Sequence, residues 1–256
     1  MLHKSRLVDQ TAPNNRLHPS ARDVMMTRAA AEAETLGGQP MTISEERFER
    51  FCARRGIPFR RVPEGPTTTP DYEIVVNGIE IVAEIKQIEP NAEDQEILRR
   101  RDRTGAAAYW VNTLRPRQSI LTGVKQLRPS AKGTRPGVVV LYELVPLLGY
   151  LGADNIAHCL YGPREVHIAV PDDPRLEPWV LGSSHGGGRV ATEHHNTTLS
   201  AVAVLEVRGE IEVISVFHNA FAAMPLDPDR FRFDGVRHFM WQAPDPNFLP
   251  CWVELA

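Results

Sequence analysis

Three charged residues that could support metal-dependent chemistry occur in one short segment of the chain. Asp71 follows a proline, and Glu84 and Lys86 lie on either side of Ile85. Carboxylate oxygens are the ligands that hard divalent cations such as Mg²⁺ prefer, and a cation of this kind can activate water. These residues can act together only if the chain between them folds back on itself.

The sequence between them predicts a β-hairpin. Asn77-Gly78 separates two runs of β-branched residues, and both central positions of the favoured type I′ turn require positive φ. This turn predicts a register in which Asp71 lies directly opposite Glu84, with Lys86 on the same face. The opposite face of the predicted hairpin is wholly apolar and consists of Tyr72, Ile74, Val76, Ile79, Ile81, Ala83 and Ile85.

The polar face of this hairpin places like charges against each other. Directly opposed residues have Cβ atoms roughly 5 Å apart, where two carboxylates are destabilising. A divalent cation with oxygen ligands would remove the conflict between Asp71 and Glu84. The alternative is a solvent-facing strand pair with scattered charges, but two opposed carboxylates and a lysine on one face favour the metal site.

Length and composition indicate an ordinary globular protein. The 256 residues are 42% hydrophobic, enough to bury the core of one large domain or of one domain with an extension. No apolar run is long enough for a membrane-spanning helix or for the core of a signal peptide, so we expect a cytoplasmic protein. Cys52, Cys159 and Cys251 lack metal-ligand spacing, and we expect them to be reduced and mostly buried.

Basic residues are concentrated between residues 97 and 137. Asp102 is the only acid in this segment, which contains ten basic residues, namely Arg99, Arg100, Arg101, Arg103, Arg115, Arg117, Lys125, Arg128, Lys132 and Arg135. This segment carries +9 and the whole chain −3, so the remainder sums to −12. Such an excess predicts a phosphate-binding surface, with the solvated face of a helix as the alternative. The candidate nucleic-acid contacts are Arg99, Arg103, Arg115, Arg117, Lys125 and Arg128.

The order of the predicted elements is that of an α/β protein. Residues 1–40 show no sustained periodicity and are interpreted as an arm with a short helix near residues 21–36, able to recruit a protein partner or a second copy in a homodimer. The remaining elements suggest helices around one mixed sheet. Helices are predicted at 44–56, at 92–103 and after Pro116, and strands at 137–142, 165–170, 201–207 and 211–217.

The hairpin residues and their surroundings resemble the PD-(D/E)xK nuclease superfamily. The matching features are Pro70-Asp71 at the start of one strand, Glu84-Ile85-Lys86 on the next, and a glutamate on the preceding helix. The resemblance covers residues 44–142. It implies a restriction-endonuclease-like core, with a mixed β-sheet flanked by helices, inside a domain at 41–256 whose residues 143–256 form a C-terminal α+β extension.

The resemblance also implies an activity. Asp71 and Glu84 would ligate one or two Mg²⁺ ions, with Mn²⁺ as a substitute, the carbonyl of Ile85 would complete the shell, and Lys86 would position or activate the attacking water. Gln87 follows the lysine as in several subgroups of the family. We therefore expect a Mg²⁺-dependent nuclease that hydrolyses phosphodiester bonds in nucleic acid, with DNA as the expected substrate. The alternative is a non-catalytic nucleic-acid-binding module that retains the fold.

Two residues compete for the role of the helix glutamate. On a helical wheel with 100° per residue, Glu45 lies nearest the edge of the apolar stripe of Phe48, Phe51 and Cys52, and Glu49 lies next nearest. We therefore predict Glu45 as the catalytic residue, with Glu49 second. For either residue the alternative is a capping acid in the first turn of the helix.

A second motif competes with the nuclease interpretation. The segment from Gly182 to Gly186 fits the GxSxG pattern of serine hydrolases, but a nucleophile elbow lies between a strand and a helix, whereas further glycines follow here. We interpret this segment as a flexible loop. Glu193-His194-His195 lacks an evident third metal ligand, so its histidines are interpreted as loop residues.

Overall fold

The computed structural model describes residues 41–63, 65, 68–109, 111–243 and 250–255. The predicted arm at residues 1–40, with its helix near residues 21–36, lies outside this range. The residues from Thr42 onward form one compact unit. Within the described ranges, no helix is both long and apolar enough to cross a membrane.

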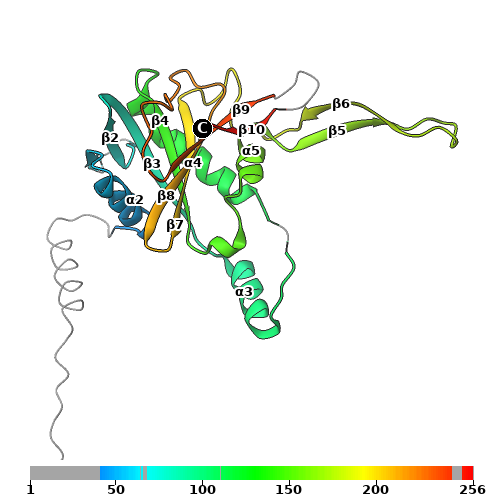
Figure 1. The fold of residues 1–256 in the computed structure, drawn as a ribbon, viewed down its shortest axis with the longest axis horizontal. Helices are drawn as coiled ribbons and strands as arrows, with labels where there is room; N and C mark the ends of the chain where they lie inside the picture. The colour runs from blue at the N-terminus through cyan, green and yellow to red at the C-terminus, as the bar shows by residue number, and fades with distance from the viewer. Residues whose placement is uncertain (1–40, 64, 66–67, 110, 244–249, 256) are drawn as a thin grey trace, which may run out of the picture. The chain divides into compact units, whose positions relative to one another are not determined.

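An eight-stranded mixed sheet forms the centre of the fold (Figure 1). The elements up to residue 142 occur in the predicted order, and the region after residue 142 contributes further strands to the same sheet. In spatial order the strands are β1 (Phe59–Arg61), β2 (Tyr72–Val76), β3 (Ile79–Ile88), β4 (Gly137–Glu143), β7 (Leu199–Arg208), β8 (Ile211–His218), β9 (Val236–Gln242) and β10 (Cys251–Glu254). β3, β4 and β7 run parallel to one another, whereas β2 and β8 pair antiparallel with β3 and β7. The predicted α/β class with a mixed sheet is therefore confirmed.

The hairpin of β2 and β3 has the predicted turn and register. Asn77 has φ +47° and Gly78 has φ +81°, as a type I′ turn requires. Val76 pairs with Ile79, and the register continues to Tyr72 opposite Ala83. The apolar face packs against α2 (Ile43–Arg54) in a core that includes Phe48, Phe51, Cys52, Tyr72, Ile74, Val76, Ile81, Ala83 and Ile85.

The opposite face of the sheet is covered by α4 (Leu114–Ala131) and α5 (Ala153–Tyr161), with the short helix η1 (Pro146–Leu148) between β4 and α5 (Figure 1). β4 lies between the two cores, and all seven of its residues are buried, as its run of aliphatic residues predicts for a strand inside a parallel sheet. The predicted apolar stripe of α4 packs in this second core, namely Ile120, Val124 and Leu127.

The ends of two helices follow their sequence signals. Thr42 caps α2 in a capping box with Glu45, and Asn91 caps α3 (Ala92–Thr104) in the same way with Asp94. Gly105 ends α3 in the left-handed conformation that glycine adopts easily. Because α3 begins shortly after β3 ends, its residues extend from the edge of the sheet at which β3 terminates (Figure 1).

β5 (Arg164–Ala169) and β6 (Trp179–His185) form a separate antiparallel two-stranded sheet, which extends away from the large sheet in Figure 1. The interpretation of residues 182–186 as a flexible loop is wrong, because the residues from Gly182 to His185 pair with β5. Pairing with a neighbouring strand here overrides the low strand propensity of a glycine- and serine-containing segment.

Candidate active site

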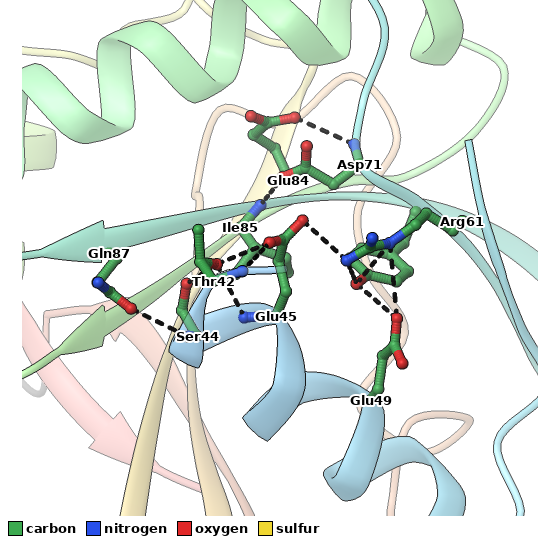
Figure 2. A network of polar contacts seen from close by, with 10 residues as sticks. Thr42, Ser44, Glu45, Glu49, Arg61, Asp71, Glu84, Ile85 and Gln87 are labelled. Atoms are coloured by element: carbon green, nitrogen blue, oxygen red, sulfur yellow. Dashed lines mark hydrogen bonds and ion pairs between the residues drawn. The ribbon is translucent and has the colours of Figure 1, made fainter. Parts of the chain in front are cut away.

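Asp71 and Glu84 lie side by side at the end of the hairpin farthest from its turn (Figure 2). The backbone N–H of Asp71 donates a hydrogen bond to Oε2 of Glu84 at 3.2 Å, and the N–H of Ile85 donates to Oδ2 of Asp71 at 2.7 Å. Each carboxylate is thus held by a backbone amide of the other chain segment. The register of the hairpin brings the two predicted ligands together, although Asp71 lies just before β2 begins.

Burial makes the charged forms of both carboxylates unfavourable. Glu84 is 0% exposed, and burial, together with the negative charge of Asp71, raises its pKa to about 8. Burial also raises the pKa of Asp71, and the hydrogen bond from the Ile85 N–H opposes that change. The two side chains therefore share a region in which their negative charge is poorly compensated.

Lys86 supplies positive charge to this pair. Its Nζ lies 2.6 Å from Oε1 of Glu84, and its side chain is 23% exposed. Among the described residues this ion pair with Lys86 is the one polar contact of Oε1. Residues two apart on a strand point to the same face, which is how the spacing of Glu84 and Lys86 places the amine beside the carboxylate.

The oxygen atoms at this place fit a hard divalent cation. The N–H and C=O groups of one strand residue point to the same side, and the Ile85 N–H points to Asp71, so the Ile85 carbonyl also faces that side. A cation there would compensate Oε1 of Glu84. Among the described residues no group of three or more His, Cys, Asp or Glu side chains is placed to hold a metal ion, so a bound ion would retain water ligands, as Mg²⁺ does readily.

Of the two predicted helix glutamates on α2, Glu45 acts on Asp71, whereas Glu49 contacts Arg61 and Tyr72 (Figure 2). The exposed fraction of the side chain is 19% for Glu45, 28% for Glu49 and 53% for Glu46, which confirms the order from the helical wheel. Oε2 of Glu45 accepts the backbone N–H of Thr42 at 2.6 Å, as a capping acid does. Its negative charge adds to the effect of burial, which raises the pKa of Asp71.

Arg61 contacts both helix glutamates, and the sequence did not single it out. Its guanidinium lies 3.1 Å from Glu45 and 3.6 Å from Glu49, and donates to the Tyr72 hydroxyl at 3.1 Å. That hydroxyl in turn donates to Glu49 at 2.8 Å. Arg61 belongs to β1, a strand of three residues that is too short to show a periodic pattern. Only its pairing with β2 brings the guanidinium to this site.

Gln87 points toward the N-terminus of α2 and not toward Lys86. Its Oε1 accepts the backbone N–H of Ser44 at 3.1 Å, and its Nε2 donates to Glu89 at 2.8 Å. It thereby satisfies one of the free N–H groups in the first turn of α2 and joins that helix to β3. The catalytic roles expected for Gln87 and Glu45 stay predictions.

The predicted nucleic-acid contacts divide into exposed residues and residues that hold the fold together. Arg103 and Lys125 are exposed, and Arg99 is exposed while it pairs with Glu96. The other three bind within the chain: Arg115 pairs with Asp94 and stacks on Tyr150, Arg117 donates to the Gly188 carbonyl, and Arg128 donates to Asn196. The exposed arginines of this set whose guanidinium groups are not bound to a distant part of the chain, Arg99 and Arg103, therefore lie on α3.

Gly123 in α4 is a further residue that shapes the site. A Cβ at this position would lie 2.8 Å from Cγ2 of Val139 and 3.4 Å from Cγ of Glu84. The absence of a side chain lets α4 approach β3 and β4 closely enough to cover Glu84. A glycine inside a predicted helix costs helix stability, which indicates a packing requirement at that position. Gly123 could have been singled out from the sequence for this reason.

The remaining candidates are placed away from this chemistry. Ser183 and Ser184 lie within β6 and not at a turn between a strand and a helix, so the geometry of a nucleophile elbow is absent there. Cys52 and Cys159 are buried as expected. The expectation of burial is wrong for Cys251, which is exposed on β10.

No protein-family model matches this chain, and neither does any curated protein or solved structure. The support for a function therefore comes from the geometry of the hairpin and its surroundings.

Proposed function

We propose that this chain is a Mg²⁺-dependent nuclease that hydrolyses phosphodiester bonds in nucleic acid, with DNA as its substrate. The observation that carries this proposal is the pair of Asp71 and the buried Glu84, with Lys86 2.6 Å from Glu84. The local charge supports the binding of a cation. Asp71, Glu84 and Glu45 place three carboxylates here, against Lys86 and the Arg61 guanidinium that pairs with Glu45.

The proposed mechanism divides the work between a bound cation and the side chains. Mg²⁺ held here would act as a Lewis acid toward the phosphoryl group and would lower the pKa of a water molecule. Asp71 and Glu84 would hold it, Asp71 being oriented by the N–H of Ile85. Lys86 would hold the attacking water and offset the negative charge that develops on the phosphate.

The arginines of α3 support a nucleic-acid substrate. α3 starts at Ala92, shortly after β3 ends at Ile88, so a strand whose phosphate lies at Lys86 can continue along this helix. Arg99 and Arg103 are exposed one helical turn apart and share a face. Contacts of this kind bind phosphates without regard to base sequence and hold the strand in position.

The test is incubation of the purified protein with supercoiled plasmid, linear duplex, single-stranded and branched DNA, and RNA, each with Mg²⁺, Mn²⁺ or EDTA. We expect cleavage of DNA with either metal and none with EDTA. Asp71→Asn should abolish cleavage. Glu46→Gln is the matched control, because Glu46 is an exposed acid of α2 whose removal leaves the carboxylate pair unchanged.

The non-catalytic alternative makes a different prediction for the same protein. A nucleic-acid-binding module would bind DNA equally well with Mg²⁺ and with EDTA, would cleave none of the substrates, and would take up no Mg²⁺ in a calorimetric titration. That combination of results would contradict the proposed nuclease.

A further inference from the structure

The sheet of β5 and β6 exposes an apolar face. Side chains alternate along β5, so Val166 and Ile168 share one face and His167 points to the other. Val180 pairs with Ile168 and therefore lies on the same face as Ile168. The exposed fraction is 50% for Val166, 56% for Ile168 and 65% for Val180, and it reaches 75% for Val170 just beyond the strand.

The opposite face of this two-stranded sheet carries polar side chains and one exposed tryptophan, Trp179, which pairs with Ala169. His167 and Ser184 lie there with Nε2 and Oγ 2.9 Å apart, and Glu165 pairs with Ser184. Alternation of this kind is the pattern of a sheet with one face in a core and one in water. An isolated pair of strands is marginally stable in water and needs a further packing surface. Within the described residues, no element packs on the apolar face.

The apolar face of the hairpin is a continuous exposed patch. Four aliphatic residues of this face each expose at least half of their surface, namely Val166, Ile168, Val170 and Val180. Together they form a patch on the order of 300–600 Å², the range of the largest and often functional patch of a monomer. Packed on the same patch of a second copy, it would form a small interface of the size at which association is weak and depends on concentration.

The charges of the hairpin favour a protein partner over nucleic acid. Phosphates would be repelled by its acidic tip. The base of the hairpin carries a net positive charge. The tip carries Asp172, Asp173 and Glu177 against Arg175, and the base carries Arg164 and Arg189 against Glu165. Two such hairpins placed antiparallel would set each acidic tip beside a basic base.

We propose that β5 and β6 form a dimerisation arm, whose apolar face packs on the same face of a second copy of this chain with the two arms antiparallel. A two-fold interface of this kind requires a self-complementary surface, and a face of valine and isoleucine meets that requirement. The antiparallel direction follows from the charges at the tip and the base. This interface is independent of the nuclease activity proposed for the hairpin of β2 and β3.

The first test is the molar mass of the full chain in solution by light scattering after gel filtration, over a range of protein concentrations. We expect twice the 28.6 kDa chain mass at high concentration. Ile168→Glu should halve the measured mass, because it places a charge in the apolar face. His167→Glu is the matched control on the polar face one residue away and should leave the dimer intact.

Both variants should remain folded, because each change is at an exposed position outside the two cores. Circular dichroism and the thermal midpoint check this. A wild-type protein that stays at the single-chain mass throughout, or an Ile168→Glu variant that stays dimeric, would overturn the proposal. A third result would also overturn it: the wild type is monomeric, and the Ile168→Glu change lowers the affinity for an oligonucleotide. The arm would then contact nucleic acid.

The second test concerns the direction of the arms. Chains carrying Val166→Cys and chains carrying Val170→Cys, both in a Cys251→Ser background, are mixed and oxidised. The antiparallel arrangement predicts disulfides between the two kinds of chain and few within either kind. Disulfides formed only between identical chains would contradict the antiparallel arm, and no disulfide in any mixture would contradict an interface on this face.

Discussion

At the scale of single residues, Glu84 has the most unusual environment in the candidate site. Burial next to Asp71 raises its pKa to about 8, whereas a glutamate in an unfolded chain titrates near pH 4.3. Between these two values the folded protein holds a proton at Glu84 that the unfolded chain has released. The unfolded state is then favoured as the pH rises, so stability falls through this window and changes little above it.

We therefore expect the thermal midpoint of the metal-free protein to fall between about pH 5 and pH 8, and added Mg²⁺ to raise it most at the upper end, where Glu84 can ionise and bind. Glu84→Gln should flatten the pH dependence and weaken the response to Mg²⁺. Thermal melts in EDTA and in Mg²⁺ measure both effects. Glu80→Gln, at an exposed position of the same strand, is the control; a Glu84→Gln variant that keeps the wild-type pH dependence would contradict the assignment.

A separate prediction concerns Lys86, which we expect to stabilise the transition state and not to contribute to DNA binding. Lys86→Ala should lower the turnover number by on the order of 10²-fold or more, while DNA affinity changes little. Single-turnover cleavage and binding to DNA in the presence of Ca²⁺ separate the two effects. Lys125→Ala, which removes an exposed lysine of α4 from the predicted DNA-contacting residues, should keep the wild-type turnover at saturating DNA. Turnover near that of the wild type in Lys86→Ala would exclude Lys86 from the chemistry.

At the scale of elements, the seating of α4 on the sheet determines how deeply Glu84 is buried. A Cβ at residue 123 would meet Val139 at 2.8 Å, and Val139 is 0% exposed on a strand enclosed from both faces, so it has no room to move away. Overpacking of this kind costs about 1–3 kcal/mol, which outweighs the gain of up to about 1 kcal/mol from replacing a helical glycine by alanine.

Gly123→Ala should therefore destabilise the protein by up to about 2 kcal/mol, as the difference between these two effects. Urea denaturation measures the change. Thr122→Ala, at the neighbouring exposed position of the same helix, should have a much smaller effect. A Gly123→Ala variant as stable as the wild type would show that α4 can lift from the sheet without cost.

The basic helix α3 has its own prediction. If Arg99 and Arg103 both contact phosphates, replacing both with alanine should weaken DNA binding similarly for all sequences and reduce the slope of log K against log salt by about two, roughly one per lost contact. The replacement of Arg115 should instead lower thermal stability, because Arg115 pairs with the buried Asp94. Binding isotherms at several salt concentrations test the first statement; an unchanged slope would assign these arginines to a solvated helix face.

At the scale of the whole molecule, β4 couples the two halves of the chain. It lies between β3 and β7, and all seven of its residues are buried. A chain ending after residue 142 would expose this strand along one edge and would lose the residues of β7 and β8 from both cores. The region that resembles the nuclease family is therefore not expected to be a folding unit by itself.

We expect the full chain to unfold in a single transition, with coincident curves from far-ultraviolet circular dichroism and tryptophan fluorescence. Two of the four tryptophans, Trp241 and Trp252, report on β9 and β10, at the opposite edge of the sheet from the hairpin of β2 and β3. A chain ending at residue 142 should show no cooperative transition. Separate transitions for the two signals would show that the two edges of the sheet unfold independently.

Local patterns in the sequence were sufficient for the hairpin and for the apolar faces of the main helices. Asn77-Gly78 specifies a two-residue turn through the positive φ of both residues, and the period of two along each strand then determines which side chains oppose each other. The carboxylate pair could be predicted for this reason, since Asp71 and Glu84 are close in sequence and related by one turn. The wheel of α2 ordered Glu45, Glu49 and Glu46 correctly because the period of a helix is also local.

Long-range pairing determined the rest. Arg61 reaches the site only through a three-residue edge strand, and Gly123 matters only because α4 crosses β4. Arg115, Arg117 and Arg128 belong to a basic segment, yet their guanidinium groups are already bound to Asp94, Gly188 and Asn196. Charge and composition describe which groups a segment offers, whereas the tertiary structure decides which of them are already bound by distant parts of the chain.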